Sequence, residues 1–107
     1  MEIIEKSRDF TKQEIYKLTH NQNVSLKDAI GEVFTVNGYL YYSDTNYRGE
    51  SIVVLVLETV QGFVSTISET FRNSFMEIVD AFPLPVDIEV IGGKTKSGRD
   101  FINCQLA

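Results

Sequence analysis

The 107-residue chain has few of the residues that carry catalytic or metal chemistry: one cysteine, one histidine and no tryptophan. A single cysteine excludes an internal disulfide and a zinc site of several thiolates, and we expect Cys104 to be a small buried side chain. His20 stands in a polar stretch, and a serine, histidine and acid triad cannot be assembled without it. We therefore expect neither catalysis nor a cofactor.

Long apolar runs are also lacking. No segment approaches the roughly 20 apolar residues that span a membrane. Residues 1–6 lack the basic start and apolar centre of a signal peptide. These absences favour a cytoplasmic protein of one domain, without a membrane partner.

Basic residues are outnumbered, ten to fifteen, and the formal net charge is −5. Residues 31–91 contain two basic and nine acidic side chains, whereas residues 92–107 contain three basic and one acidic side chain. A nucleic-acid partner would therefore need a local basic patch together with ring stacking, because no general basic surface exists.

Helix signals mark the first 30 residues. Thr11 and Glu14 have the spacing of a capping box, which predicts a helix through about Thr19. Residues 25–30 are typical of a further helical turn that Gly31 ends. We interpret residues 1–30 as an N-terminal helical segment outside a domain of residues 31–107.

From residue 32 the apolar pattern has a period of two. Strands are predicted at residues 33–42, 52–57 and 63–67, with a loop at 44–49. Phe34, Val36 and Leu40 fall on one face, but Gly38 is typical of a bulge, which would swap the facing of the tyrosines that follow.

A second helix is predicted from about Glu69 to Phe82, capped by Ser68 and ended by Pro83. Strands follow at 86–90 and 101–106, joined by a Gly-rich basic loop at 92–99. The residues expected to face the core are Phe71, Phe75, Ile78, Val79 and Phe82 from the helix and Val86, Ile88, Val90, Ile102, Cys104 and Leu106 from the strands.

The predicted order of three strands, a helix and two strands is that of an OB-fold. This mainly β fold is a five-stranded barrel that binds oligonucleotides or oligosaccharides on its second and third strands and nearby loops. Four of the five tyrosines lie within residues 39–47, on the first predicted strand and its loop. Such rings either pack in the barrel or stack on bases, at roughly 1–3 kcal/mol per base.

Cations accompany the aromatic residues in both long loops. Arg48 follows Tyr47, and Phe101 follows Lys94, Lys96 and Arg99. The loop at 92–99 lacks the glycine spacing of a P-loop and leads into a strand. Cations beside rings are typical of a single-strand platform, although ordinary solvated hairpins have the same composition.

Three stretches carry a family resemblance: Tyr-Tyr-Ser-Asp-Thr-Asn-Tyr at 41–47, Gly-Phe-Val-Ser-Thr-Ile-Ser at 62–68, and Val-Ile-Gly-Gly-Lys-Thr-Lys-Ser-Gly at 90–98. In this order they resemble the small single-stranded DNA-binding proteins of phages of Gram-positive bacteria, closest to those with protein-primed replication. The resemblance implies that Tyr42 and Tyr47 face DNA. A third family tyrosine falls at Val64, with Phe63 as a candidate replacement.

The resulting hypothesis is a protein that coats and protects exposed strands in phage-type DNA replication or recombination, with little sequence preference. Its partners would be single-stranded DNA and replication or recombination proteins, in the host cytoplasm if a phage encodes it. Alternatives are a protein-interaction module and an oligosaccharide-binding domain. The candidate nucleic-acid-binding residues are Tyr39, Tyr41, Tyr42, Tyr47, Arg48, Phe63, Lys94, Lys96, Arg99 and Phe101.

Overall fold

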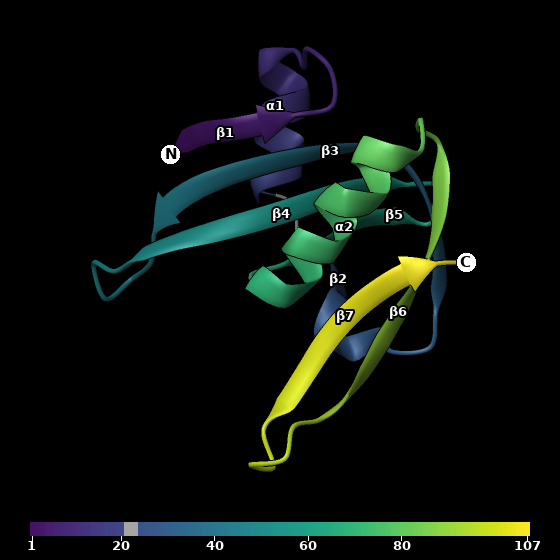
Figure 1. The fold of residues 1–107 in the computed structure, drawn as a ribbon. Helices are drawn as coiled ribbons and strands as arrows, with labels where there is room; N and C mark the ends of the chain where they lie inside the picture. Colours follow the sequence, from purple (N-terminus) through teal and green to yellow (C-terminus); the bar gives the residue numbers. More distant parts are fainter. Residues whose placement is uncertain (21–23) are drawn as a thin grey trace.

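The computed structural model describes residues 1–20 and 24–107, which form a curled, half-barrel sheet with two α-helices (Figure 1). The mainly β class is therefore as predicted. The elements are β1 (Glu2–Lys6), α1 (Lys12–His20), β2 (Val24–Ser25), the 3₁₀ turn η1 (Leu26–Asp28), β3 (Val33–Thr45), β4 (Ser51–Thr59), β5 (Gly62–Thr66), α2 (Glu69–Ala81), β6 (Val86–Lys94) and β7 (Asp100–Leu106).

The strand order is β2-β5-β4-β3-β6-β7, with β1 also paired to β3. Strand β3 has 13 residues and serves two partners along one edge: its first part pairs with β6 (Val33↔Glu89) and its last part with β1 (Glu2↔Ser43). Its other edge pairs with β4. Within the described residues β5 and β7 do not pair, so the curled sheet remains open between them.

A bulge interrupts β3 at the predicted glycine. The register with β4 passes from Val36↔Thr59 to Gly38↔Glu58. Gly38 is buried, and a Cβ there would lie 2.9 Å from Glu58 Oε1 and 3.1 Å from Ser7 Oγ, so only glycine fits without rearrangement. The bulge places Tyr39 with Phe34 and Val36 in the inner core.

The expected grouping of Leu40 with Phe34 and Val36 is wrong, because the bulge turns Leu40 to the opposite face. There Leu40 packs with Leu18, Tyr42 and Val56 in a separate outer cluster. One extra residue reverses the facing of every side chain that follows it along a strand. The tyrosines of β3 are thereby divided between the two faces.

Helix α2 fills the inner side of the curl. Its N-cap is as predicted: Ser68 Oγ accepts a hydrogen bond from the Phe71 backbone N–H. Phe71 and Phe75 are fully buried. The inclusion of Phe82 in the core stripe is wrong, since the helix ends at Ala81 and Phe82, in an extended conformation, is exposed.

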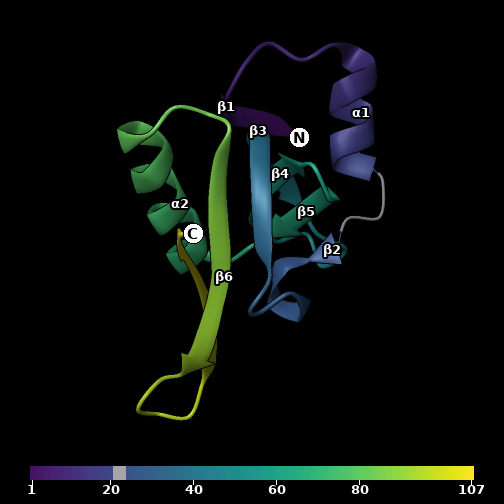
Figure 2. The ribbon, with the colours of Figure 1, turned by 90° about the vertical axis from the view of Figure 1, so that its right-hand side faces the viewer.

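The N-terminal segment is part of the sheet, which corrects its description as helical only. Strand β1 pairs with β3, and β2 pairs in parallel with β5. The capping box is present, with Thr11 N–H donating to Glu14 Oε1 over 2.9 Å and Glu14 N–H donating to Thr11 Oγ1 over 3.1 Å. Helix α1 lies on the side of the sheet opposite α2 (Figure 2).

The C-terminal hairpin is longer than predicted, because β6 continues to Lys94. Gly92 and Gly93 therefore pair with β7 instead of forming a loop. Cys104 is buried as predicted, and burial raises its pKa to about 12. Leu106, expected inside, is exposed near the strand end. In the described part of the chain no helix is long and apolar enough to cross a membrane.

Candidate nucleic-acid interface

Two of the candidate tyrosines are buried on opposite faces. Tyr39 meets Phe75 edge-on with 5.5 Å between ring centroids, and its hydroxyl donates to Glu5 Oε1 over 3.3 Å. Tyr42 packs in the outer cluster with Leu18. Burial is the main cause of the raised pKa of both tyrosines. Tyr42, which the resemblance expects to face DNA, is therefore covered by other side chains in this fold.

Two further candidates are only partly accessible. Tyr41 lies at the margin of the inner core, where the Arg72 guanidinium stands 5.1 Å from its ring centroid. Phe63 lies at the margin of the outer cluster. The structure therefore does not collect the rings of β3 and β5 into one open platform.

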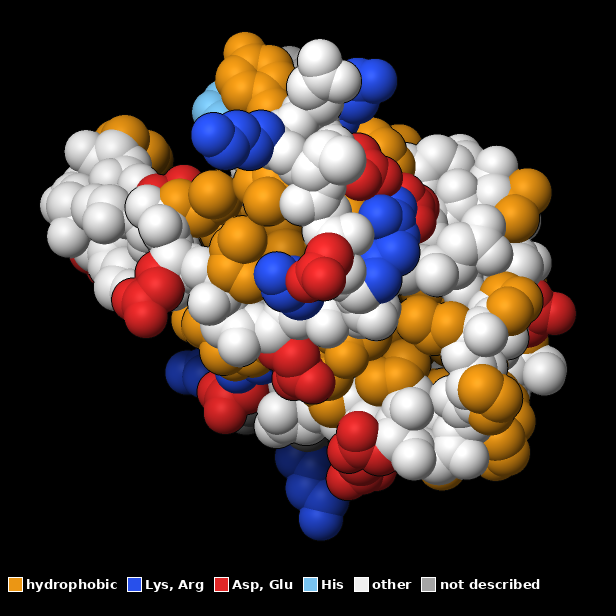
Figure 3. Space-filling model, turned by 90° about the horizontal axis from the view of Figure 1, so that it is seen from above, with side chains coloured by type: hydrophobic (Ala, Val, Ile, Leu, Met, Phe, Trp, Pro, Cys, Tyr) orange, Lys and Arg blue, Asp and Glu red, His pale blue; other side chains and the backbone are white. Residues whose placement is uncertain are grey.

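Residues 1–20, which we call the N-terminal cover, close the outer cluster: Leu18 of α1 is buried in it, and Phe10 and Ile3 pack against it. Arg8 anchors this cover: its Nη2 lies 2.7 Å from Glu14 Oε2 and 3.3 Å from Glu58 Oε2 of β4. The hydrogen bond from Arg8, with a further one from the Thr11 backbone, lowers the pKa of Glu14 from 4.5 to about 2. Figure 3 shows acidic and basic side chains interspersed on this face, without a broad basic patch.

The tip of the β3–β4 hairpin presents an open ring with a cation. Tyr47 is 90% exposed, and Arg48 Nε donates to its hydroxyl over 3.0 Å. Asn46 Oδ1 accepts from the backbone N–H groups of Arg48 (2.9 Å) and Glu50 (3.0 Å), which shapes the turn. This turn holds Tyr47 away from the core and available for stacking.

The β6–β7 hairpin carries the second ring and the basic group. Phe101 is 38% exposed and pairs with Gly93, where a Cβ would lie 3.2 Å from the ring. Lys96 and Arg99 are exposed in the turn, whereas Lys94 Nζ pairs with Asp100 Oδ1 over 3.1 Å. The hairpin thus offers two exposed cations in its turn and a partly exposed ring on β7 close to that turn.

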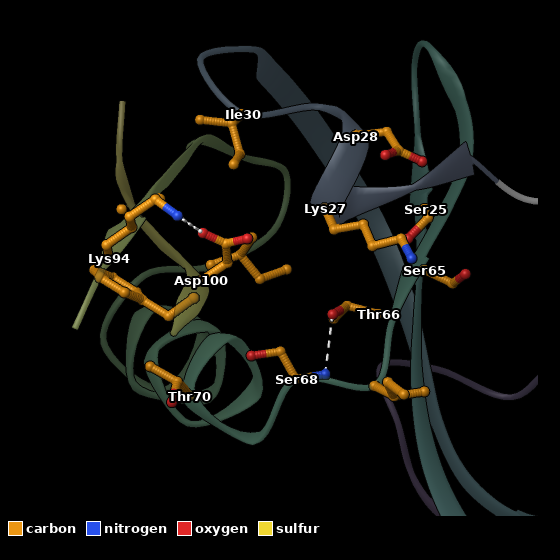
Figure 4. Close-up of a pocket in the computed structure, with 15 residues that line it drawn as sticks. Ser25, Lys27, Asp28, Ile30, Ser65, Thr66, Ser68, Thr70, Lys94 and Asp100 are labelled. Carbon is orange, nitrogen blue, oxygen red and sulfur yellow. Dashed lines mark hydrogen bonds and ion pairs between the residues drawn. The ribbon is translucent and has the colours of Figure 1, made fainter. Parts of the chain in front are cut away.

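A cleft of about 950 Å³ opens between this hairpin, η1, the end of β5 and the first turn of α2 (Figure 4). It lies where the curled sheet remains unpaired between β5 and β7. Lys94 and Lys27 stand on opposite sides, with Thr66 and Ser68 between them. The lining residues are Ser25, Lys27, Asp28, Ile30, Ser65, Thr66, Ile67, Ser68, Thr70, Gly92, Gly93, Lys94, Asp100, Phe101 and Ile102.

Most of this cleft was missed by sequence reasoning. Of the predicted residues, only Lys94 and Phe101 line it; Tyr47 and Arg48 lie at a separate hairpin tip (Figure 1). Lys27 and Ile30 belong to a segment that was expected to lie outside the domain. No local signal identifies them, because they reach the cleft only through pairing with distant strands.

No family model, curated protein or solved structure matches the chain. Among residues 1–20 and 24–107 there is also no group of three or more histidine, cysteine or acidic side chains that could hold a metal ion. The chemistry of the candidate interface is that of aromatic rings, cations and hydroxyl groups.

Proposed function

We propose that the protein is an OB-fold single-stranded DNA-binding protein that coats exposed strands with little sequence preference. The order of β3 to β7, with α2 between β5 and β6, supports the OB-fold, as does the pairing of β3 with both β4 and β6. Within the described residues β5 and β7 do not pair with each other, which makes this an open version of that barrel.

The observation that carries the proposal is an accessible aromatic ring with nearby cations on each of the two long hairpins. Tyr47 with Arg48 occupies one tip, while Phe101 with Lys96 and Arg99 belongs to the other hairpin. Rings stack on bases whatever their identity, and cations bind phosphates without reading sequence. A net charge of −5 is compatible with this function because the cations are local. The setting of phage replication or recombination rests on the sequence resemblance.

A protein-interaction module is the second candidate. It is favoured by Ile30 and Ile67, which line the cleft and are 54% and 68% exposed. An apolar protein interface responds weakly to salt, whereas DNA binding weakens steeply as salt rises because counterions are released. Salt dependence therefore distinguishes the two functions.

The test is titration of oligo(dT) at several salt concentrations, followed by quenching of intrinsic tyrosine fluorescence. The variant Lys96→Gln/Arg99→Gln removes two hairpin cations, and Lys12→Gln/Lys17→Gln makes the same charge change on α1. We expect the hairpin variant to flatten the slope of log affinity against log salt by about 1.4, at about 0.7 for each phosphate contact, and the α1 variant to change it little. Absence of oligo(dT) binding by the parent protein would refute the proposed function.

A further inference from the structure

We infer that the cleft receives a nucleobase of the bound strand and leaves the phosphates outside, an inference that rests on the proposed function. The charge inside the cleft is balanced. Lys27 is next to Asp28 in sequence, and Lys94 pairs with Asp100 over 3.1 Å. A phosphate would gain little in such a neutral site. Lys96 and Arg99 are exposed in the turn and do not line the cleft, so phosphates can contact them outside it.

The walls suit a flat, uncharged ring. Phe101 contributes an aromatic face, and Ile30 and Ile67 contribute exposed apolar surface. Glycine provides the space on the opposite strand: a Cβ at Gly93 would lie 3.2 Å from the Phe101 ring. Stacking on aromatic and apolar side chains is the usual means by which single-stranded bases are held.

The hydroxyl groups of Thr66 and Ser68 lie between the walls and can donate hydrogen bonds to the edge of a base. Thr66 Oγ1 accepts from the Ser68 backbone N–H over 3.0 Å, and Ser68 Oγ accepts from the Phe71 N–H over 3.2 Å. Within the described residues neither hydroxyl donates a hydrogen bond, and Thr66 is more than nine-tenths buried. Figure 4 shows both oxygens toward the open centre. Each O–H can donate to a base carbonyl, as carried by thymine, cytosine and guanine.

The N-terminal segment supplies the opposite wall in a preformed position. Gly31 N–H donates to Val90 O over 2.7 Å, and Val90 N–H donates to Glu32 O over 2.9 Å. Gly92 permits the close approach of Ile30, whose Cδ1 would lie 2.6 Å from a Cβ at that position. These contacts fasten the segment after η1 to β6, so the cleft exists before any ligand arrives.

The experiment compares fluorescein-labelled oligo(dT) with an abasic oligonucleotide of equal length and charge, by fluorescence anisotropy. Phe101→Leu keeps apolar cover over Gly93 but removes the aromatic face. Phe82→Leu, at the far end of α2, is the matched control. We expect Phe101→Leu to weaken oligo(dT) binding about 5- to 100-fold, without changing the salt slope or abasic affinity, because stacking releases no counterions. Phe82→Leu should bind like the parent protein.

A second variant tests the position of the ring without altering it. In Gly93→Ala the new methyl group displaces Phe101, so oligo(dT) binding should weaken while abasic binding is unchanged. Circular dichroism is used to check that both variants are folded. Equal parent affinities for the two oligonucleotides, or unchanged oligo(dT) affinity in folded Phe101→Leu, would overturn the base site while leaving strand binding intact. Failure of the parent protein to bind either oligonucleotide would instead refute the proposed function.

Discussion

The outer face of the sheet and the cleft differ in what covers their aromatic side chains. Tyr42 and Phe63 on the outer face lie against the N-terminal cover, in a cluster with Leu18. Phe101 at the cleft is left 38% exposed. All three belong to strands with strong β patterns. A segment distant in sequence thus covers one set of rings and thereby decides which aromatic residues remain available to a ligand.

The N-terminal residues 1–30 also have different roles at the outer face of the sheet and at the cleft. Over the outer face, α1 contributes the buried Leu18, and Arg8, which precedes α1, forms ion pairs with Glu14 and Glu58, so this part closes a surface. At the cleft, the segment after η1 is held to β6 by backbone hydrogen bonds and leaves the space beside it open. One 30-residue stretch therefore closes one surface and builds a wall of another.

The largest effect is expected from breaking the N-terminal cover. Leu18 is 1% exposed in the outer cluster, so Leu18→Ala should lower the free energy of unfolding by about 2–5 kcal/mol through lost burial and a cavity. Urea denaturation measures this loss, and Lys17→Ala, exposed on the same helix, is the control. Equal stability of the two variants would show that the cover contributes little to the fold.

A smaller effect on oligo(dT) affinity is expected for the exposed Tyr47, and no effect on affinity for the buried Tyr42. Tyr47→Ala should weaken oligo(dT) binding by about 1–3 kcal/mol, the value of one stacked base. Tyr42→Leu should reduce thermal stability, because its ring is buried, but leave the affinity of the folded protein unchanged. Anisotropy titrations and melting curves measure the two quantities. An affinity loss confined to Tyr42→Leu would reverse the assignment of the binding surface.

The smallest expected effect is the loss of thermal stability at low pH that follows from protonation of Glu14 in the N-terminal cover. The pKa of Glu14 is lowered from 4.5 to about 2, chiefly by Arg8, so its ionised form stabilises the fold above about pH 4.5. This contribution is lost as the pH falls through that window toward 2. The melting temperature should therefore exceed that of Glu14→Gln near neutral pH, and the difference should shrink near pH 2. A difference that is constant with pH would exclude an ionised Glu14 as the anchor of Arg8.

Local signals made several features predictable. The capping box of Thr11 and Glu14 and the Ser68 cap act over three residues and are present as expected. The bulge at Gly38 was anticipated, but its consequence for facing depends on the partner strand. Strand β1 was missed, because residues 2–6 alternate weakly and their partner lies more than 30 residues away on β3.

The candidate site was predictable only in its hairpin residues. Tyr47, Arg48, Lys96 and Arg99 follow strands and face solvent, so their exposure follows from local turn chemistry. Tyr39 and Tyr42 could not be assigned to a face, since burial depends on α2 and α1, which pack from opposite sides. The position of Lys27 and Ile30 at the cleft could not be predicted from the sequence either, because it depends on packing against distant strands.

The positions of most helices and strands, the turns that join them and the small amount of basic charge available to a polyanion follow from the amino-acid sequence alone. Helix capping, turn geometry and the apolar period depend on residues that are close in sequence, so short stretches of the chain are enough to predict them. Which rings are covered, and where the sheet stays open, depends instead on how distant segments pack together. Those outcomes depend on surfaces that residues far apart bury together, and the same tyrosine can belong to a core or to an interface according to what packs against it.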